Sequence, residues 1–210
     1  MERRTFAIRA LPGMRDEAER KLKALEPFIR QAADHQKISN LSIWGVEDMF
    51  FGYGEYDHPV EPDVERELQN ELDRTMDGYS ELLCPPGTMR LMYHDIGIVR
   101  QDKSLIRHRV FATRLKPGCA EEYKRRHDAL IAARGDAVSE GPDSNFTIWY
   151  GAGYIFGYCE KVKSFDREMT PQEREDTIAW ETRQLEIMDW LTDDVDWITG
   201  EKHEHIRRII

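Results

Sequence analysis

The chain has 210 residues, of which 40% are hydrophobic and 33% are charged, and its formal net charge is −10 at pH 7. This charge argues against nucleic acid or polyphosphate partners, because phosphate binding needs clustered Lys and Arg. No run approaches the roughly 18–20 apolar residues of a membrane span, and the charged N-terminus leads directly into a strand pattern, so no membrane partner is expected.

The first half of the chain predicts alternating strands and helices. A strand over 4–11 ends at Pro12-Gly13, and the apolar positions that follow describe an amphipathic helix over about 16–33. Pro27 should bend or restart this helix, because it removes one helical hydrogen bond. The pattern then predicts a hairpin, a second helix and a closing strand, over 41–44 and 49–53, about 62–83, and 89–99.

The second half repeats this plan. Strands are predicted over 107–115, 144–150, 154–161 and 203–210, and helices over about 119–139 and 171–191. The run Thr170-Pro171-Gln172-Glu173 supports the start of the last helix, because it combines an N-cap Thr, a Pro at the first helical position and a Glu at the third.

The repetition extends to the residues themselves. At an offset of 105 residues, positions 6–55 align on 111–160 without a gap, and 18 of the 50 aligned positions are identical. A period of this length has the size of a small domain rather than of a solenoid unit. The sequence therefore predicts a duplicated domain, with one copy over 1–100, a second over 106–210, and a short connector between them.

The order of elements in each copy is βαββαβ, which is typical of a ferredoxin-like α+β fold. Each copy is expected to form a four-stranded antiparallel sheet with two helices on one face. Two sheets with one bare apolar face each are expected to pack on each other, as a pseudo-dimeric α+β barrel. The chain could then act as a monomer or form a homo-oligomer. Three cysteines at unrelated spacings predict neither a disulfide framework nor a metal motif, which favours a cytoplasmic location.

The chemistry is expected where the copies differ. Tyr123 and His127 lie four residues apart on the core-facing side of their predicted helix, and Phe146 starts a strand. The first copy has apolar residues at the three aligned positions, which are Ala18, Leu22 and Leu41. We therefore expect one site, in the second copy, with the first copy as scaffold. The alternative is that His127 has only a structural role, as a buried core histidine hydrogen-bonded to a backbone carbonyl.

The second copy resembles the L-rhamnose mutarotase family, whose members belong to the dimeric α+β barrel superfamily and interconvert sugar anomers. The similarity rests on four segments, which are 115–118 (Leu-Lys-Pro-Gly), 122–127 (Glu-Tyr-Lys-Arg-Arg-His), 145–148 (Asn-Phe-Thr-Ile) and 156–160 (Phe-Gly-Tyr-Cys-Glu). Phe146 stands where the family has a second substrate tyrosine. The family's Trp-Trp pair has no match, and Trp180 and Trp190 are the nearest indoles.

The resemblance implies a sugar mutarotase that needs no cofactor and no metal. It assigns proton donation to His127 and substrate binding to Tyr123, Asn145 and Phe146, and Trp190 could stack on the sugar. A histidine suits this chemistry because its ordinary pKa lies near neutrality. The expected partner is a small sugar, for instance a rhamnose-like aldose.

Three alternatives stay open. The protein could be a non-catalytic module that binds a sugar or another small metabolite, or a small-substrate isomerase or oxygenase, since one fold hosts many activities. A metal site could form from His203, His205 and His108, although histidines at the edge of a sheet are usually solvated.

Overall fold

The computed structural model describes the chain except for residues 60–61, 139–140, 142, 164–167 and 193–205. The described chain divides into two compact units. The first comprises Met1–Met89 together with Arg207–Ile210, and the second comprises Arg90–Ile206. None of the helices in the described ranges is long and apolar enough to span a bilayer.

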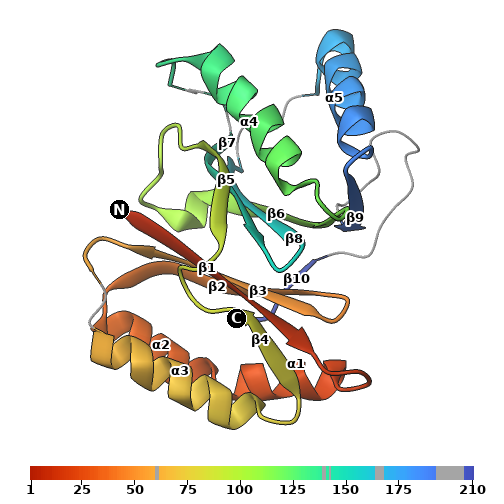
Figure 1. The fold of residues 1–210 in the computed structure, drawn as a ribbon. Helices are drawn as coiled ribbons and strands as arrows, with labels where there is room; N and C mark the ends of the chain where they lie inside the picture. Colours follow the sequence, from red (N-terminus) through yellow and green to blue (C-terminus); the bar gives the residue numbers. More distant parts are fainter. Residues whose placement is uncertain (60–61, 139–140, 142, 164–167, 193–205) are drawn as a thin grey trace. The chain divides into compact units, whose positions relative to one another are not determined.

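The first unit contains a five-stranded antiparallel sheet and three helices (Figure 1). The strand order is β10-β2-β3-β1-β4. Its elements are β1 (Glu2–Ala10), α1 (Arg15–Ala24), α2 (Glu26–His35), β2 (Ile38–Val46), β3 (Met49–Tyr56), α3 (Pro62–Met76), β4 (Ser80–Cys84) and β10 (Arg207–Arg208). The predicted helix restart is confirmed, because α1 ends at Ala24 and Pro27 lies in the first turn of α2.

The second unit has a sheet of the same size, with the order β5-β7-β8-β6-β9. Two helices and a short 3₁₀ turn complete it. Its elements are β5 (Arg90–Asp95), η1 (Lys103–Leu105), β6 (Ile106–Leu115), α4 (Ala120–Arg134), β7 (Asp143–Gly151), β8 (Tyr154–Val162), α5 (Pro171–Gln184) and β9 (Met188–Thr192).

The ferredoxin-like fold class is confirmed. Four strands of each sheet follow the ferredoxin-like order, β4-β1-β3-β2 in the first unit and β9-β6-β8-β7 in the second. In each unit the helices cover one face of the sheet (Figure 1). That the two bare sheet faces pack on each other stays a prediction.

Both long C-terminal helices were predicted too long. The helix predicted over about 62–83 ends at Met76, where Gly78 adopts a positive φ of 76°, and the chain continues as strand β4. The helix predicted over 171–191 ends at Gln184 and is followed by β9. The helical spacing of Tyr79 and Leu83 misled the prediction, because a short strand after a tight turn can place apolar residues at the same intervals.

The predicted closing strands are exchanged between the sheets. Strand β5, expected to complete the first copy, pairs antiparallel with β7 of the second sheet, from Arg90 opposite Tyr150 to Asp95 opposite Phe146. Strand β10 pairs with β2 of the first sheet, with Arg207 opposite Gly45. Each repeat closes its own sheet with β4 or β9 instead. Alternating apolar residues indicate a strand but do not indicate which sheet edge it joins.

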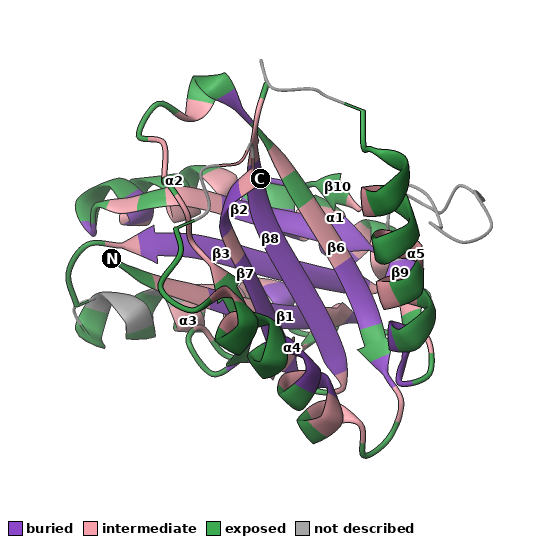
Figure 2. Cartoon of the chain, turned by 90° about the horizontal axis from the view of Figure 1, so that it is seen from above, coloured by how far each residue is buried: buried purple, intermediate pink, exposed green. Residues whose placement is uncertain are grey.

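The helix side of each sheet holds the core of its unit. Figure 2 shows the strands buried along most of their length, whereas the helices expose their outer sides. In the first unit, the exchanged segment contributes directly to this core, because Ile209 and Ile210 are 8% and 4% exposed and pack with Ile43 and Phe50. The exchange therefore adds buried apolar area as well as sheet hydrogen bonds.

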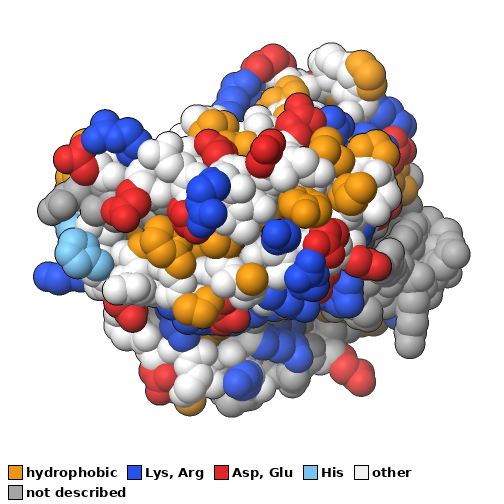
Figure 3. Space-filling view, turned by 90° about the horizontal axis from the view of Figure 1, so that it is seen from below, with side chains coloured by type: hydrophobic (Ala, Val, Ile, Leu, Met, Phe, Trp, Pro, Cys, Tyr) orange, Lys and Arg blue, Asp and Glu red, His pale blue; other side chains and the backbone are white. Residues whose placement is uncertain are grey.

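The outer surface of the first unit carries mixed charges. Figure 3 shows basic and acidic side chains interspersed over this face. Charged side chains also pair along the helices of this unit, including Lys23 with Glu19 at 2.7 Å and Arg30 with Glu26 at 2.6 Å. Such exposed pairs contribute only a few tenths of a kcal/mol each, so they matter more for surface charge than for stability.

Candidate active site

Helix α4 places Tyr123 and His127 against the sheet of the second unit. The two side chains are 2% and 3% exposed, which confirms that they lie on the buried side of the helix. Their rings stack, with centroids 4.2 Å apart and planes inclined by 26°. Tyr123 packs in the same core cluster as Ile148 and Ile155 of the neighbouring strands.

His127 has one ring nitrogen engaged and one available. Nδ1 lies 2.9 Å from the backbone oxygen of Tyr123. Because a carbonyl can only accept, Nδ1 carries the proton, and Nε2 of the neutral ring is left as an acceptor. Burial lowers the pKa of His127 to about 4. The imidazole is therefore neutral at physiological pH and presents a basic Nε2.

Aromatic rings enclose this histidine. Besides Tyr123, the rings of Tyr93 from β5 and Trp180 from α5 meet it edge to face, both with centroids 5.4 Å away. These contacts fix the ring plane and keep water from much of the imidazole. The lowered pKa follows from this enclosure, because the charged form would lose most of its hydration.

A pocket of about 220 Å³ lies next to His127, between the sheet and the helices α4 and α5. Its walls are mainly aromatic, with a small number of polar groups, as is usual for a site that binds a small molecule. It is lined by Tyr93, Arg109, Phe111, Tyr123, His127, Leu130, Phe146, Ile148, Thr177, Trp180, Glu181, Gln184, Met188 and Trp190. Two of these lining residues are exposed to solvent, which are Arg109 and Leu130, the latter at 39% exposure.

The floor of the pocket depends on a glycine. Phe111 lies directly over Gly157 on the neighbouring strand, so close that a Cβ at position 157 would be 2.0 Å from a carbon of its ring. The same ring meets Phe146 and Trp190 edge to face, with centroids 6.3 and 5.8 Å away. The absence of a side chain at Gly157 therefore sets the position of three aromatic rings.

Helix α5 provides the wall that faces α4. Its start is fixed by the predicted capping box, since the Thr170 backbone donates to the Glu173 carboxylate at 2.8 Å and the Glu173 backbone donates to Thr170 Oγ1 at 3.3 Å. The residues that line the pocket follow at helical spacing from that start, and they are Thr177, Trp180, Glu181 and Gln184. Burial, followed by the nearby Glu181 carboxylate, raises the pKa of Tyr123 far above its ordinary range, so its phenol stays protonated.

Arg126 joins the two helices beside the pocket. It is 7% exposed and donates to Glu122 on its own helix at 2.7 Å and to Glu186 beyond α5 at 2.9 Å. It also donates to the backbone oxygen of Arg183. Because Arg126 precedes His127 and Arg183 precedes Gln184, this contact fixes the spacing between the two sides of the pocket.

A scan against protein-family models finds that residues 108–208 match the family described as L-rhamnose mutarotase. This part of the chain, slightly less than half of its length, is similar to that family. Neither the search of curated proteins nor the search of solved structures finds a match. The matched residues include His127 and all of α4 and α5, while β5 lies outside them.

Within this segment, the structure brings four of the five predicted site residues together. Tyr123, His127, Phe146 and Trp190 all line the pocket. Asn145 does not, because it precedes Phe146 on β7 and its side chain lies on the opposite face of the sheet. It adopts a positive φ of 53° at a β-bulge and donates from Nδ2 to Glu160 at 2.9 Å. Its observed role is to position the strand that carries Phe146.

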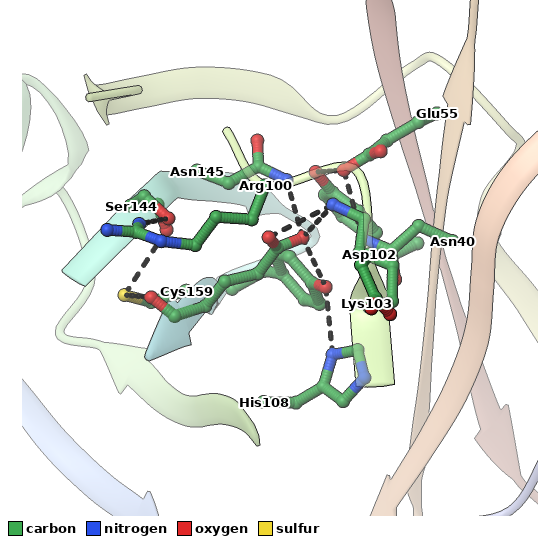
Figure 4. Close-up of polar contacts among 12 residues, drawn as sticks. Asn40, Glu55, Arg100, Asp102, Lys103, His108, Ser144, Asn145 and Cys159 are labelled. Atoms are coloured by element: carbon green, nitrogen blue, oxygen red, sulfur yellow. Dashed lines mark hydrogen bonds and ion pairs between the residues drawn. The ribbon is translucent and has the colours of Figure 1, made fainter. Parts of the chain in front are cut away.

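Asn145 belongs to a polar network whose centre, Glu160, is buried (Figure 4). Glu160 is 0% exposed and also accepts from Lys103 at 2.7 Å and from the Tyr158 hydroxyl at 3.2 Å. His108, which was considered as a metal ligand, lies with Nδ1 2.8 Å from that hydroxyl. The other two histidines of that alternative, His203 and His205, lie outside the described residues.

Sequence reasoning missed several residues of this pocket. Tyr93 was assigned to the first repeat and reaches the pocket only through the strand exchange. Glu181 and Gln184 face the sheet from α5, where a search for apolar spacing passes over polar residues. A polar residue at a helix position predicted to face the sheet is the signal that could have identified them.

The first unit has no comparable acid and base groups at the aligned positions. Leu22, which aligns with His127, is 0% exposed in the core, and Leu41 aligns with Phe146. A pocket of about 90 Å³ lies beside Leu41 and is mainly apolar, and its one charged lining residue among those described is Arg4, which pairs with Glu2 at 2.7 Å. This contrast supports a single site in the second unit.

Proposed function

We propose that the pocket of the second unit interconverts the two anomers of an aldose, with His127 transferring the proton. The neutral imidazole of His127, with Nδ1 committed to the backbone and Nε2 left basic beside a pocket of sugar size, is the observation that carries the proposal. The similarity of residues 108–208 to the L-rhamnose mutarotase family supports a rhamnose-like pyranose as the substrate.

The proposed reaction opens and closes the sugar ring. Nε2 of His127 accepts the proton of the anomeric hydroxyl, the bond between the anomeric carbon and the ring oxygen breaks, and the ring oxygen takes up a proton. The open aldehyde rotates about its bond to the next carbon and recloses by the reverse steps. No atom is gained or lost, and histidine is both acceptor and donor over one cycle.

The ring oxygen needs a proton donor when the ring opens. Tyr123 stacks on His127, and its phenol stays protonated. We therefore propose that the Tyr123 hydroxyl donates either a proton or a hydrogen bond to the departing ring oxygen. The resemblance alone assigned proton donation to His127. Because burial keeps that ring neutral, we propose instead that His127 acts first as the base.

The remaining walls suit the body of a pyranose. The C–H faces of a sugar are apolar and pack well on aromatic rings, which Phe146 and Trp190 provide on the sheet side. The hydroxyl groups at the edge of the sugar need polar partners. Helix α5 provides such partners in Thr177, Glu181 and Gln184. The pocket thus has an apolar side and a polar side, as a pyranose does.

The pH dependence of exchange tests the role of His127. If neutral His127 is the base, kcat/KM should rise with pH through about 4 and stay level up to neutrality, because the reactive form is the deprotonated one. A histidine with an ordinary pKa would place this rise near pH 6.5. The measurement is magnetisation transfer between the anomer signals of L-rhamnose across this range. A rate that falls as pH rises above 4 would show that the protonated ring is required.

The proposal as a whole is tested by the parent protein. Addition of protein should increase anomer exchange for at least one common aldose above the uncatalysed rate, with one binding site per chain by calorimetric titration. If no aldose shows faster exchange, the protein is not a mutarotase. Two equivalent sugar sites per chain would contradict the assignment to the second unit.

A further inference from the structure

Gln184 is the most unusual polar residue of the pocket. It is the last residue of α5, and its side chain is 2% exposed, among the largest fully buried side chains of the described chain. It lines the pocket together with Glu181 and Thr177, which lie one and two turns before it on the same side of the helix. Its side chain therefore forms part of the pocket wall beside His127, and both polar atoms of its amide are buried in that wall.

Neither polar atom of this amide is satisfied. Within the described ranges, no group lies within hydrogen-bond reach of Gln184 Oε1 or Nε2. The large majority of buried side-chain polar atoms in proteins have a partner, and an unsatisfied amide lowers the stability of the fold. A methionine or leucine would fill the same volume without that cost. The missing hydrogen bonds of the Gln184 amide are thus of the kind that a bound ligand would supply.

The chemistry of the amide selects the kind of ligand. A primary amide presents one acceptor and one donor side by side, which matches two hydroxyls on adjacent carbons, one donating to Oε1 and the other accepting from Nε2. Resting on the proposed function, we propose that Gln184 is a specificity residue that binds two adjacent ring hydroxyls of the sugar. The substrate class is then pyranoses with such a pair on the edge that faces α5.

The first experiment compares Gln184→Met with the parent protein. Methionine keeps the length of the side chain and removes both hydrogen bonds, so binding of L-rhamnose should weaken by about ten- to a hundredfold. The unliganded variant should melt about 2–4 °C higher, because the unsatisfied amide is gone. A higher melting temperature with weaker binding is the pattern expected of a binding residue, and a purely structural residue would not give it.

The matched control is Gln36→Met. Gln36 is also a buried glutamine, at 6% exposure, but it lies in the first unit and its amide is 3.1 Å from Nδ1 of His35. This change should lower the melting temperature and leave sugar binding unchanged. Should Gln184→Met fail to fold, Gln184→Leu removes the same two hydrogen bonds with a different shape.

Analogues of L-rhamnose that each lack one ring hydroxyl make the test decisive. Two of these analogues lack a hydroxyl that Gln184 is proposed to bind, and for them Gln184→Met should reduce binding affinity less than it does for L-rhamnose. For the other analogues the reduction in affinity should equal that for L-rhamnose. An equal loss for L-rhamnose and every analogue, or no loss at all, would overturn the proposal. If Gln184 is required for binding but the parent protein shows no exchange, the mutarotase function fails while this inference stands. If the parent binds no sugar, both fail.

Discussion

Replacing His127 by asparagine is expected to slow anomer exchange by roughly 10²–10⁴, the contribution of a positioned acid or base group. Asparagine can still donate to the backbone oxygen of Tyr123 as Nδ1 does, but it has no basic atom in place of Nε2. The lost ring contacts should lower the free energy of unfolding by about 1–3 kcal/mol. Exchange is measured by NMR and unfolding by chemical denaturation, on the same preparation.

His35→Asn is the control for this change. His35 is an exposed histidine at the end of α2 in the first unit, far in sequence from the pocket residues. It should leave both exchange and sugar binding unchanged. A His127→Asn protein that is less stable but fully active would remove His127 from the mechanism and would favour its interpretation as a core histidine.

Gly157→Ala is expected to lower the free energy of unfolding by about 1–3 kcal/mol and to weaken sugar binding. The new methyl group would overlap the Phe111 ring at 2.0 Å, and that ring can move only by displacing Phe146 or Trp190, which form the floor of the pocket. Denaturation and calorimetric titration measure the two effects.

The first unit provides a matched control at the aligned position. Gly52→Ala would place its Cβ 1.8 Å from the Phe6 ring, a clash of the same kind. It should cost similar stability but leave sugar binding unchanged, because the proposed site is in the other unit. Equal loss of binding in both variants would mean that the effect on binding comes from reduced stability and not from the floor of the pocket.

The sequence was sufficient to predict what depends on local patterns. Helix α4 was predicted with Tyr123 and His127 on its buried side because their spacing follows one helical face, and the capping box of α5 was read from four residues. The apolar stripe beyond them was less reliable. The helix predicted over about 119–139 ends at Arg134 instead, where Gly135 adopts a positive φ of 59°, and Val138 beyond it is 64% exposed.

The pairing of strands and the partners of side chains could not be predicted in this way. Strand β5 has the alternation of any strand, and its pairing with β7 depends on the sheet edge available in the folded chain. The resemblance assigned Asn145 to the substrate, yet its amide donates to Glu160, a partner that only the folded chain reveals. The position of Gln184 on the sheet side of its helix could have been predicted, but its unsatisfied amide depends on the groups that surround it in the folded chain.

Because the closing strands are exchanged, residues from both halves of the chain build the unit that contains the pocket. Tyr93, which meets His127 edge to face, comes from a strand that the sequence assigns to the first repeat. Ile209 and Ile210, at the other end of the sequence, complete the core of the unit without the pocket. A substitution in β5 therefore alters the unit with the pocket, whereas a substitution in β10 alters the first unit.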